Sequence, residues 1–240
     1  MKSCRPLLCA LTLAACASPA PPGTAPASGV VRITPVRPVA ELLPIALAAQ
    51  PPHEVGEFRP PDLVEITTLN TAILLDIRYA GSDNFLGTPL YTEARAFLQR
   101  PAAEALLRVQ NSLAAEGYGL VIFDAYRPWY VTRLFWDAMP PDKHRFVADP
   151  AQGSRHNRAC AVDVTLYDLS TGKEVSMPSV YDETTERAYP TYEGGTAEQR
   201  RRRDLLRRHM EAEGFTVHQY EWWHFDYRDW QSYAIQDKRL

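Results

Sequence analysis

The sequence predicts an α+β domain with a small, mainly antiparallel sheet and segregated helices. Short β-rich segments are mixed with segments of helical spacing, and no regular strand-helix-strand repeat connects them. About 180 residues from Asp62 onward have the size of one ordinary domain with a sizeable core.

Two elements are expected early in this domain. Residues 73–79 are β-rich and end in a turn cluster at 80–84, which predicts a strand running into a loop. Apolar residues at helical spacing over 102–116 predict an amphipathic helix that opens after Pro101 and closes at Gly117.

A second strand and helix should follow directly. The apolar stretch 120–123 predicts a short buried strand that delivers residues 124–127 to its end. Pro128 suits a first helical turn and should start a helix through about residue 138.

Residues 160–166 have the two-residue period of a strand. Cys160 falls on the apolar face, so we interpret it as structural rather than as a nucleophile. Asp163 falls on the opposite face and should look into a cleft, where the small Ala161 leaves room for a ligand.

A long helix should precede the closing strands. Thr196 and Gln199 form a capping box for a helix that runs to Glu213 and stops at Gly214. Its arginine run at 200–203 favours a solvated helix face over a binding patch.

The closing strands are expected at 215–217 and 222–225. In an unbroken strand, Glu221 and His224 would point to opposite faces of the sheet. If they share one site, the backbone near Glu221 must be bent or bulged.

The N-terminus carries a secretory signal over residues 1–15. Lys2 and Arg5 precede an apolar stretch that is too short for a permanent membrane helix. The L-A-A-C sequence at 13–16 resembles a lipobox and predicts acylation of Cys16, hence a periplasmic, membrane-anchored lipoprotein. Ordinary signal-peptidase cleavage after the A-C-A triplet is the alternative, and either reading exports the chain.

Residues 16–61 are rich in proline and alanine, which predicts a tether before a domain at 62–240. A short helical piece around residues 41–49 could pack on the domain. Beyond the signal, Cys16 would be acylated, which leaves Cys160 alone and allows no internal disulfide. Loss of the two signal-peptide cations moves the formal net charge from −3 to −5, and nothing indicates nucleic-acid binding.

His156, Asp163 and His224 form a candidate metal site. Two imidazoles and one carboxylate can hold a hydrolytic Zn²⁺ while one coordination position stays open. Glu221 lies beside the last ligand, where such a site needs a general base. Each residue alone is more often an ordinary hydrogen-bonded side chain, but the combination indicates a zinc peptidase.

The same residues resemble a known family. Ser154, His156, Ala161 and Asp163, followed by E-x-x-H at 221–224, match the motif of D-alanyl-D-alanine dipeptidases, which belong to the zinc D,D-peptidases. Further similar segments are 76–80, 84–87, 124–128, 148–150, 177–182 and 186–187. The resemblance covers nearly the whole chain after residue 62, implies the Hedgehog/D-Ala-D-Ala peptidase-like fold, and favours a dipeptidase over the carboxypeptidases of the group.

The resemblance implies roles for the motif residues. His156, Asp163 and His224 would bind one zinc ion, and Glu221 would be the general base. Arg127 would stabilise the tetrahedral oxyanion, and the alternative for it is a structural salt bridge, for example to Asp124.

The resemblance also implies how a dipeptide is held. Tyr79 and Asp182 would bind its free ammonium, and Ser154 would bind its C-terminal carboxylate. Two positions depart from the family pattern. Ala159 replaces the motif glycine, which strains the chain if this position is left-handed, and Pro178 stiffens the loop before Asp182.

The expected function is zinc-dependent hydrolysis of D-alanyl-D-alanine in cell-wall peptide turnover. Two rivals stay open: a D,D- or L,D-carboxypeptidase acting on peptidoglycan stems, and a lipoprotein that binds wall fragments without cleaving them. An intact Glu221 weighs against the non-catalytic binder.

Overall fold

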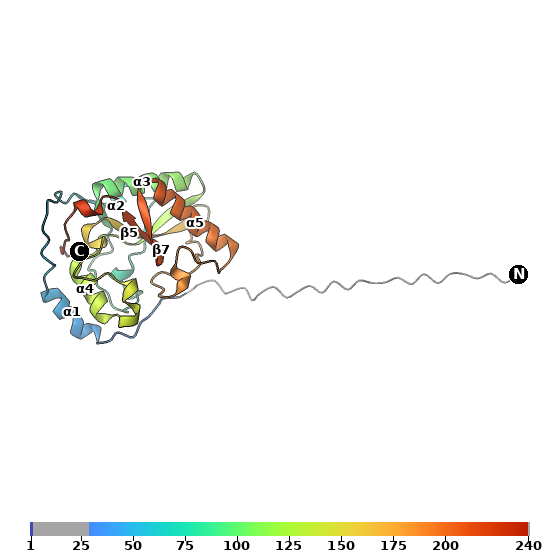
Figure 1. The fold of residues 1–240 in the computed structure, drawn as a ribbon. Coiled ribbons are helices and arrows are strands. Elements are labelled where there is room, and N and C mark those ends of the chain that lie inside the picture. The colour runs from blue at the N-terminus through green and yellow to red at the C-terminus, as the bar shows by residue number, and fades with distance from the viewer. Residues whose placement is uncertain (2–28, 240) are drawn as a thin grey trace.

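The computed structural model describes Met1 and residues 29–239 of the chain. Its centre is a five-stranded sheet with the order β2-β4-β5-β7-β6, beside a two-stranded sheet of β1 and β3. Strands β5 and β7 of the larger sheet lie near the middle of the folded part (Figure 1). The strands are β1 Leu63–Glu65, β2 Leu74–Leu75, β3 Phe97–Gln99, β4 Tyr118–Asp124, β5 Ala161–Asp168, β6 Phe215–His218 and β7 Glu221–Tyr227. Among these described strands only the β2–β4 pair is parallel, which confirms the mainly antiparallel α+β fold.

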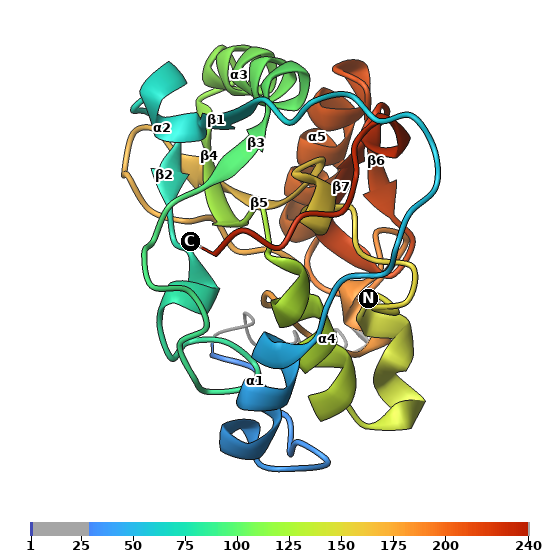
Figure 2. The same cartoon turned by 90° about the vertical axis from the view of Figure 1, so that its left-hand side faces the viewer.

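Four of the described α-helices pack in two pairs. The α-helices are α1 Val39–Ala48, α2 Ile66–Leu69, α3 Arg100–Ala114, α4 Trp129–Ala138 and α5 Ala197–Ala212. Short 3₁₀ helices lie at η1 Arg78–Ala80, η2 Pro141–Phe146, η3 His156–Arg158, η4 Glu186–Ala188 and η5 Trp230–Ser232. Helices α3 and α5 lie side by side, and α1 and α4 lie together at the opposite end (Figure 2). Within residues 29–239 no helix combines the length and apolarity needed to cross a bilayer.

The expected helices form with the expected ends. Helix α3 has Pro101 in its first turn, and Gly117 takes a φ of 85° after it. Helix α5 opens with the capping box of Thr196 and Gln199. One detail of α5 differs, because Arg203 is buried and donates to the carbonyl of Tyr192, so the arginine run is not wholly solvated.

The strand expected over 73–79 is shorter than predicted. Of these residues only Leu74 and Leu75, strand β2, pair with β4, and the chain then turns through η1. The carbonyl of Tyr79 accepts hydrogen bonds from the N–H groups of Leu90 and Tyr91, at 2.7 and 2.9 Å. These bonds hold Tyr79 in a turn against the neighbouring loop instead of in the sheet.

The described part of the proline-rich segment lies on the domain. The helical piece expected around 41–49 is α1, which buries Leu42 and Ala46 against α4. Glu54 also pairs with Arg158, which lies within the metal motif, between His156 and Asp163. Residues 29–61 are therefore packed rather than a free tether, whereas the expected signal peptide and Cys16 lie outside the described residues.

Candidate metal centre and active site

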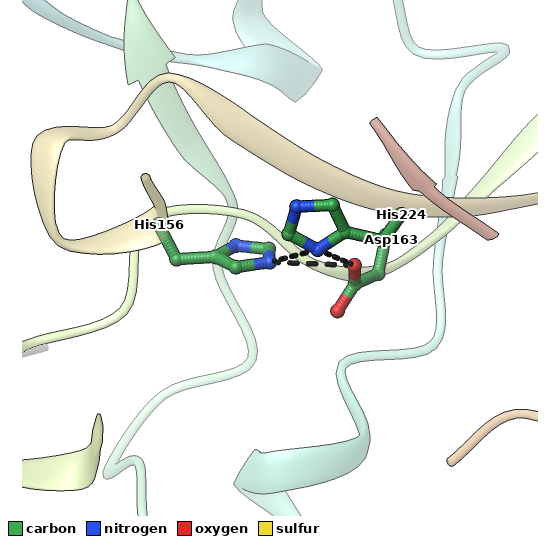
Figure 3. Close-up of side chains that lie close together, drawn as sticks. All are labelled: His156, Asp163 and His224. Atoms are coloured by element: carbon green, nitrogen blue, oxygen red, sulfur yellow. Dashed lines mark hydrogen bonds and ion pairs between the residues drawn. The ribbon is translucent and has the colours of Figure 1, made fainter. Parts of the chain in front are cut away.

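Strand pairing brings the candidate ligands together. Asp163 of β5 is directly opposite His224 of β7 in the ladder, and His156 reaches them from η3. His156 Nε2 lies 3.3 Å from Asp163 Oδ1 and 3.1 Å from His224 Nδ1, and the last two atoms are 3.1 Å apart (Figure 3). All three side chains are buried.

The outer nitrogen of each imidazole is already engaged. His156 Nδ1 lies 2.6 Å from the carbonyl of Ala125, and because a carbonyl can only accept, this nitrogen carries the proton. His224 Nε2 lies 2.9 Å from Asp226 Oδ1 and is fixed in the same way. In the neutral rings the two inner nitrogens therefore present lone pairs to the centre of the triad.

These three atoms fit a metal ion. Asp163 Oδ1 is buried and accepts no hydrogen bond from any described donor. A tetrahedral zinc ion about 2.0–2.1 Å from each ligand would separate ligand atoms by about 3.3 Å, close to the observed distances. When both rings are neutral, the centre of the triad holds three acceptors and no donor, an arrangement that a bound cation satisfies.

The charges around the triad lead to the same conclusion. Burial raises the pKa of Asp163, but His156 and His224 outweigh it and hold that pKa well below its usual value. Burial disfavours a charged His224, but Asp226 and Asp163 outweigh it and raise the pKa of His224 to about 10. Without a metal, a proton would fill this negative cluster, so a metal ion and a proton compete for it.

Glu221 faces the triad because the β6–β7 hairpin is irregular. The ladder register shifts between Val217, paired with Phe225, and His218, paired with Glu221. This is the backbone irregularity that the sequence predicts, and it places Glu221 Oε2 3.8 Å from His224 Nδ1. Burial, aided by Asp163, raises the pKa of Glu221 to about 7, a value suited to a general base near neutral pH.

Arg127 forms the structural salt bridge and also reaches the triad. Its Nε and Nη2 both lie 2.8 Å from Asp124 Oδ2, so the structural salt bridge is present. Its Nη2 also lies 3.6 Å from Asp163 Oδ2, at the edge of the triad. Burial lowers the pKa of Arg127, but Asp124 outweighs it, so the guanidinium stays charged beside the metal site.

Tyr79 and Asp182 form a pair, as the dipeptide-binding interpretation requires. The Tyr79 hydroxyl donates to Asp182 at 3.0 Å. Burial, followed by the charge of Asp163, raises the pKa of Asp182 well above its usual value. Asp182 also takes a φ of 61°, so its loop holds the carboxylate in a strained backbone conformation.

All the candidate metal, catalytic and substrate-binding residues line one small cavity. Its volume is about 120 Å³, well below the roughly 300–1,000 Å³ of pockets for drug-sized ligands, so it suits a small molecule. Its lining includes Tyr79, Arg127, Ser154, His156, Asp163, Asp182, Glu221 and His224. A larger cavity of about 250 Å³ lies beyond Asp182 but contacts no member of the triad, so the chemistry belongs to the smaller one.

The remaining sequence positions are also placed. Ser154 is buried, and its Oγ accepts from the N–H of His156 at 3.2 Å. Ala159 takes a φ of 55°, so this position is left-handed and the alanine that replaces the motif glycine has a strained backbone. The carbonyl of Pro178 accepts from Arg187. Cys160 is fully buried, and burial raises the pKa of its thiol to about 12, which supports a structural role.

Sequence reasoning missed the residues that support the site. Tyr181 donates to Asp163 Oδ2 at 2.8 Å, and Tyr91 donates to Asp124 at 2.8 Å. Asp226 could have been found, since it lies two residues after His224 and therefore on the same face of the strand. Tyr91 could not, because no local pattern joins its loop to β4.

Comparisons with known proteins agree with this geometry. The Peptidase_M15 family model, described as D-ala-D-ala dipeptidase, matches residues 60–238. The D-alanyl-D-alanine dipeptidase of Escherichia coli (strain K12) is 33% identical over 174 residues, covering 72% of this chain and 89% of the relative. The D-alanyl-D-alanine dipeptidase of Enterococcus faecalis (strain ATCC 700802 / V583) is 38% identical over 169 residues, covering 62% of this chain and 83% of the relative. The dipeptidase of Enterococcus faecium is 35% identical over 172 residues, covering 64% of this chain and 85% of the relative.

Proposed function

The chain belongs to the D-Ala-D-Ala dipeptidase family of metallopeptidases, and we propose that it uses one zinc ion to hydrolyse free D-alanyl-D-alanine to two D-alanines. The observation that carries the proposal is the buried His156–Asp163–His224 triad at the wall of a cavity that Glu221, Tyr79 and Asp182 also line. Turnover of cell-wall peptides would supply this substrate.

The metal would provide the Lewis acid. A zinc ion held by the triad lowers the pKa of water toward about 7 and polarises a carbonyl. The imidazole and carboxylate donor set suits zinc, and the hydrogen bonds from His156 to Ala125 and from His224 to Asp226 fix the rings for metal binding.

Protein groups would carry the proton and the developing charge. Glu221 takes the proton of the attacking water and returns it to the leaving amine, as its raised pKa allows. Arg127, oriented by Asp124, donates to the oxyanion of the tetrahedral intermediate. Because this guanidinium is positioned before substrate binds, little reorganisation is needed during the reaction.

The two ends of a dipeptide meet different walls of the cavity. Asp182 and Tyr79 bind the free ammonium, which relieves the repulsion that Asp182 feels from Asp163. Ser154 lies in the wall beside His156 and binds the C-terminal carboxylate. A site of this size and polarity selects a free dipeptide.

The site would act outside the cytoplasm. The charged and apolar N-terminal sequence and the lipobox support export to the periplasm and anchoring to a membrane through Cys16. This location matches a substrate derived from the cell wall.

The test compares two substrates on the same full-length protein. Metal is removed by chelation and restored with Zn²⁺, and release of D-alanine is measured from D-Ala-D-Ala and from a muropeptide that ends in D-Ala-D-Ala. Zinc-dependent cleavage of the free dipeptide alone is expected. Faster cleavage of the muropeptide would instead favour a carboxypeptidase, and cleavage of neither by zinc-loaded protein would favour a binding protein.

A further inference from the structure

Arg155 lies in the cavity wall without a hydrogen-bonding partner. It stands between Ser154 and His156, and its guanidinium stacks 4.6 Å from the ring centre of Trp230. Its buried Nε is 3.6 Å from Asp226 Oδ2, too far for a hydrogen bond, and the side chain has no hydrogen bond within residues 29–239. The guanidinium is thus oriented by Trp230 and by an ion pair with Asp226, while it donates no hydrogen bond within the described residues.

Two other arginines, Arg127 and Arg145, line the same cavity. Arg145 is exposed on η2, where its guanidinium lies 5.8 Å from the ring centre of Phe146, whereas Arg127 is already bound to acidic partners. Arg127 is held by two nitrogens on Asp124 and also faces Asp163, so its charge is balanced by acidic groups. Asp226 shares its negative charge between two partners. Its Oδ1 is hydrogen-bonded to His224, and only its Oδ2 faces Arg155, at 3.6 Å. Arg155 is therefore the better counter-ion for an added anion.

A continuous line of polar contacts separates Arg155 from the ammonium site. Asp182 binds Tyr79, whose hydroxyl meets that of Tyr181 at 3.2 Å, and Tyr181 donates to Asp163. From there the line continues through His224 and Asp226 to Arg155. The metal-binding triad thus lies between an acidic end and a basic end, and both ends line one cavity.

We propose that Arg155 is the specificity residue that binds the C-terminal carboxylate of the substrate. A hydroxyl alone cannot neutralise a carboxylate, whereas a guanidinium can bind it with two parallel N–H donors. Ser154 adds one further donor, because its Oγ accepts from the backbone N–H of His156 and keeps its own proton free. The preferred substrates are dipeptides with a free α-carboxylate one residue beyond the scissile bond.

This inference rests on the proposed dipeptidase function and predicts a selectivity. Loss of a charge-assisted hydrogen bond should cost about 10- to 100-fold in kcat/KM for D-Ala-D-Ala. D-alanyl-D-alaninamide has no carboxylate, so the same change should leave its kcat/KM within about threefold. The acid-to-amide ratio of kcat/KM should therefore collapse in Arg155→Ala.

The experiment measures both substrates with zinc-loaded wild type, Arg155→Ala and Arg155→Lys. The ratio is internal to each preparation, so a partly inactive or less stable variant does not distort it. Arg155→Lys keeps the charge but loses the planar fork, and it should restore part of the ratio. Arg201→Ala on exposed α5 removes an arginine away from the cavity and is the matched control.

Two outcomes overturn different statements. Suppose that wild type cleaves the dipeptide and that Arg155→Ala lowers kcat/KM equally for both substrates, or lowers it for neither. Arg155 then only packs on Trp230, and the carboxylate binds elsewhere. If zinc-loaded wild type does not cleave D-Ala-D-Ala, the proposed function itself fails and this inference fails with it.

Discussion

Asp163 and His224 are direct neighbours across the β5–β7 ladder, so backbone hydrogen bonding sets the distance between two of the three candidate metal ligands. On the other side of β5, Asp124 of β4 pairs with Asp163 after a register irregularity. One row across three strands thus contains two candidate metal ligands and the residue that orients Arg127. Because side chains alternate along a strand, a slip of one residue would turn a ligand away from the site.

The first prediction concerns the metal. His156→Ala should bind less than one tenth of the zinc held by wild type after dialysis and should lose activity, because it removes one of three converging ligand atoms. Metal content measured by mass spectrometry checks this, with the exposed His53→Ala as control. Full zinc occupancy in His156→Ala would exclude this residue as a ligand.

The second prediction concerns the base. Glu221→Gln should keep zinc and fold while kcat falls by about 10²–10⁴, because it loses only a proton acceptor. In wild type, kcat/KM should fall as the pH drops and Glu221 becomes protonated. Burial raises its pKa to about 7, and a bound cation would lower this value, so the acidic limb should lie at or below pH 7. A variant that stays within a few fold of wild type would rule out Glu221 as the base.

The third prediction concerns backbone strain within the metal motif. Ala159 has a φ of 55°, where glycine avoids a steric cost of roughly 1 kcal/mol. Ala159→Gly should therefore raise the free energy of unfolding by about 0.5–1 kcal/mol, measured in denaturant on metal-free protein. Ala161→Gly, in the adjacent strand, should lower it by a similar amount. Destabilisation by both substitutions would mean that the buried methyl of Ala159 outweighs the strain.

Local sequence patterns predicted the parts of the structure that depend on residues close together in the sequence. Helix α5 follows from its capping box, the cleft-facing position of Asp163 follows from strand alternation, and the hairpin irregularity follows from the need to bring Glu221 to His224. The proline content of 16–61 suggested a tether, but packing depends on partners elsewhere in the chain. Glu54 accepts from Arg158 across more than a hundred residues, which no local pattern can show.

The fourth prediction concerns the anchor. Cys16→Ser should shift the protein from the membrane fraction to a soluble or unprocessed form, because the acylation site is lost. Fractionation followed by immunoblotting checks this, with Cys9→Ser, inside the signal, as control. Unchanged membrane association of Cys16→Ser would favour a retained signal or simple secretion.

The last prediction concerns the ammonium end of the substrate. Burial and the charge of Asp163 raise the pKa of Asp182, so this carboxyl holds a proton at pH values where an ordinary aspartate is ionised. A substrate ammonium must displace that proton, so KM for D-Ala-D-Ala should rise as the pH falls, and Asp182→Asn should remove this dependence.

N-acetylation of the dipeptide tests the same contact from the substrate side. The acetyl group removes the positive charge and adds bulk next to Asp182 and Tyr79, which should lower kcat/KM by at least about 10² in wild type. Asp182→Asn should reduce cleavage of the free dipeptide far more than cleavage of the acetylated one, because only the free dipeptide uses the charge. Equal losses on both substrates would mean that Asp182 only supports its own strained loop. Wild-type cleavage of the acetylated dipeptide as fast as the free one would mean that the cavity is open toward the N-terminal side of the substrate.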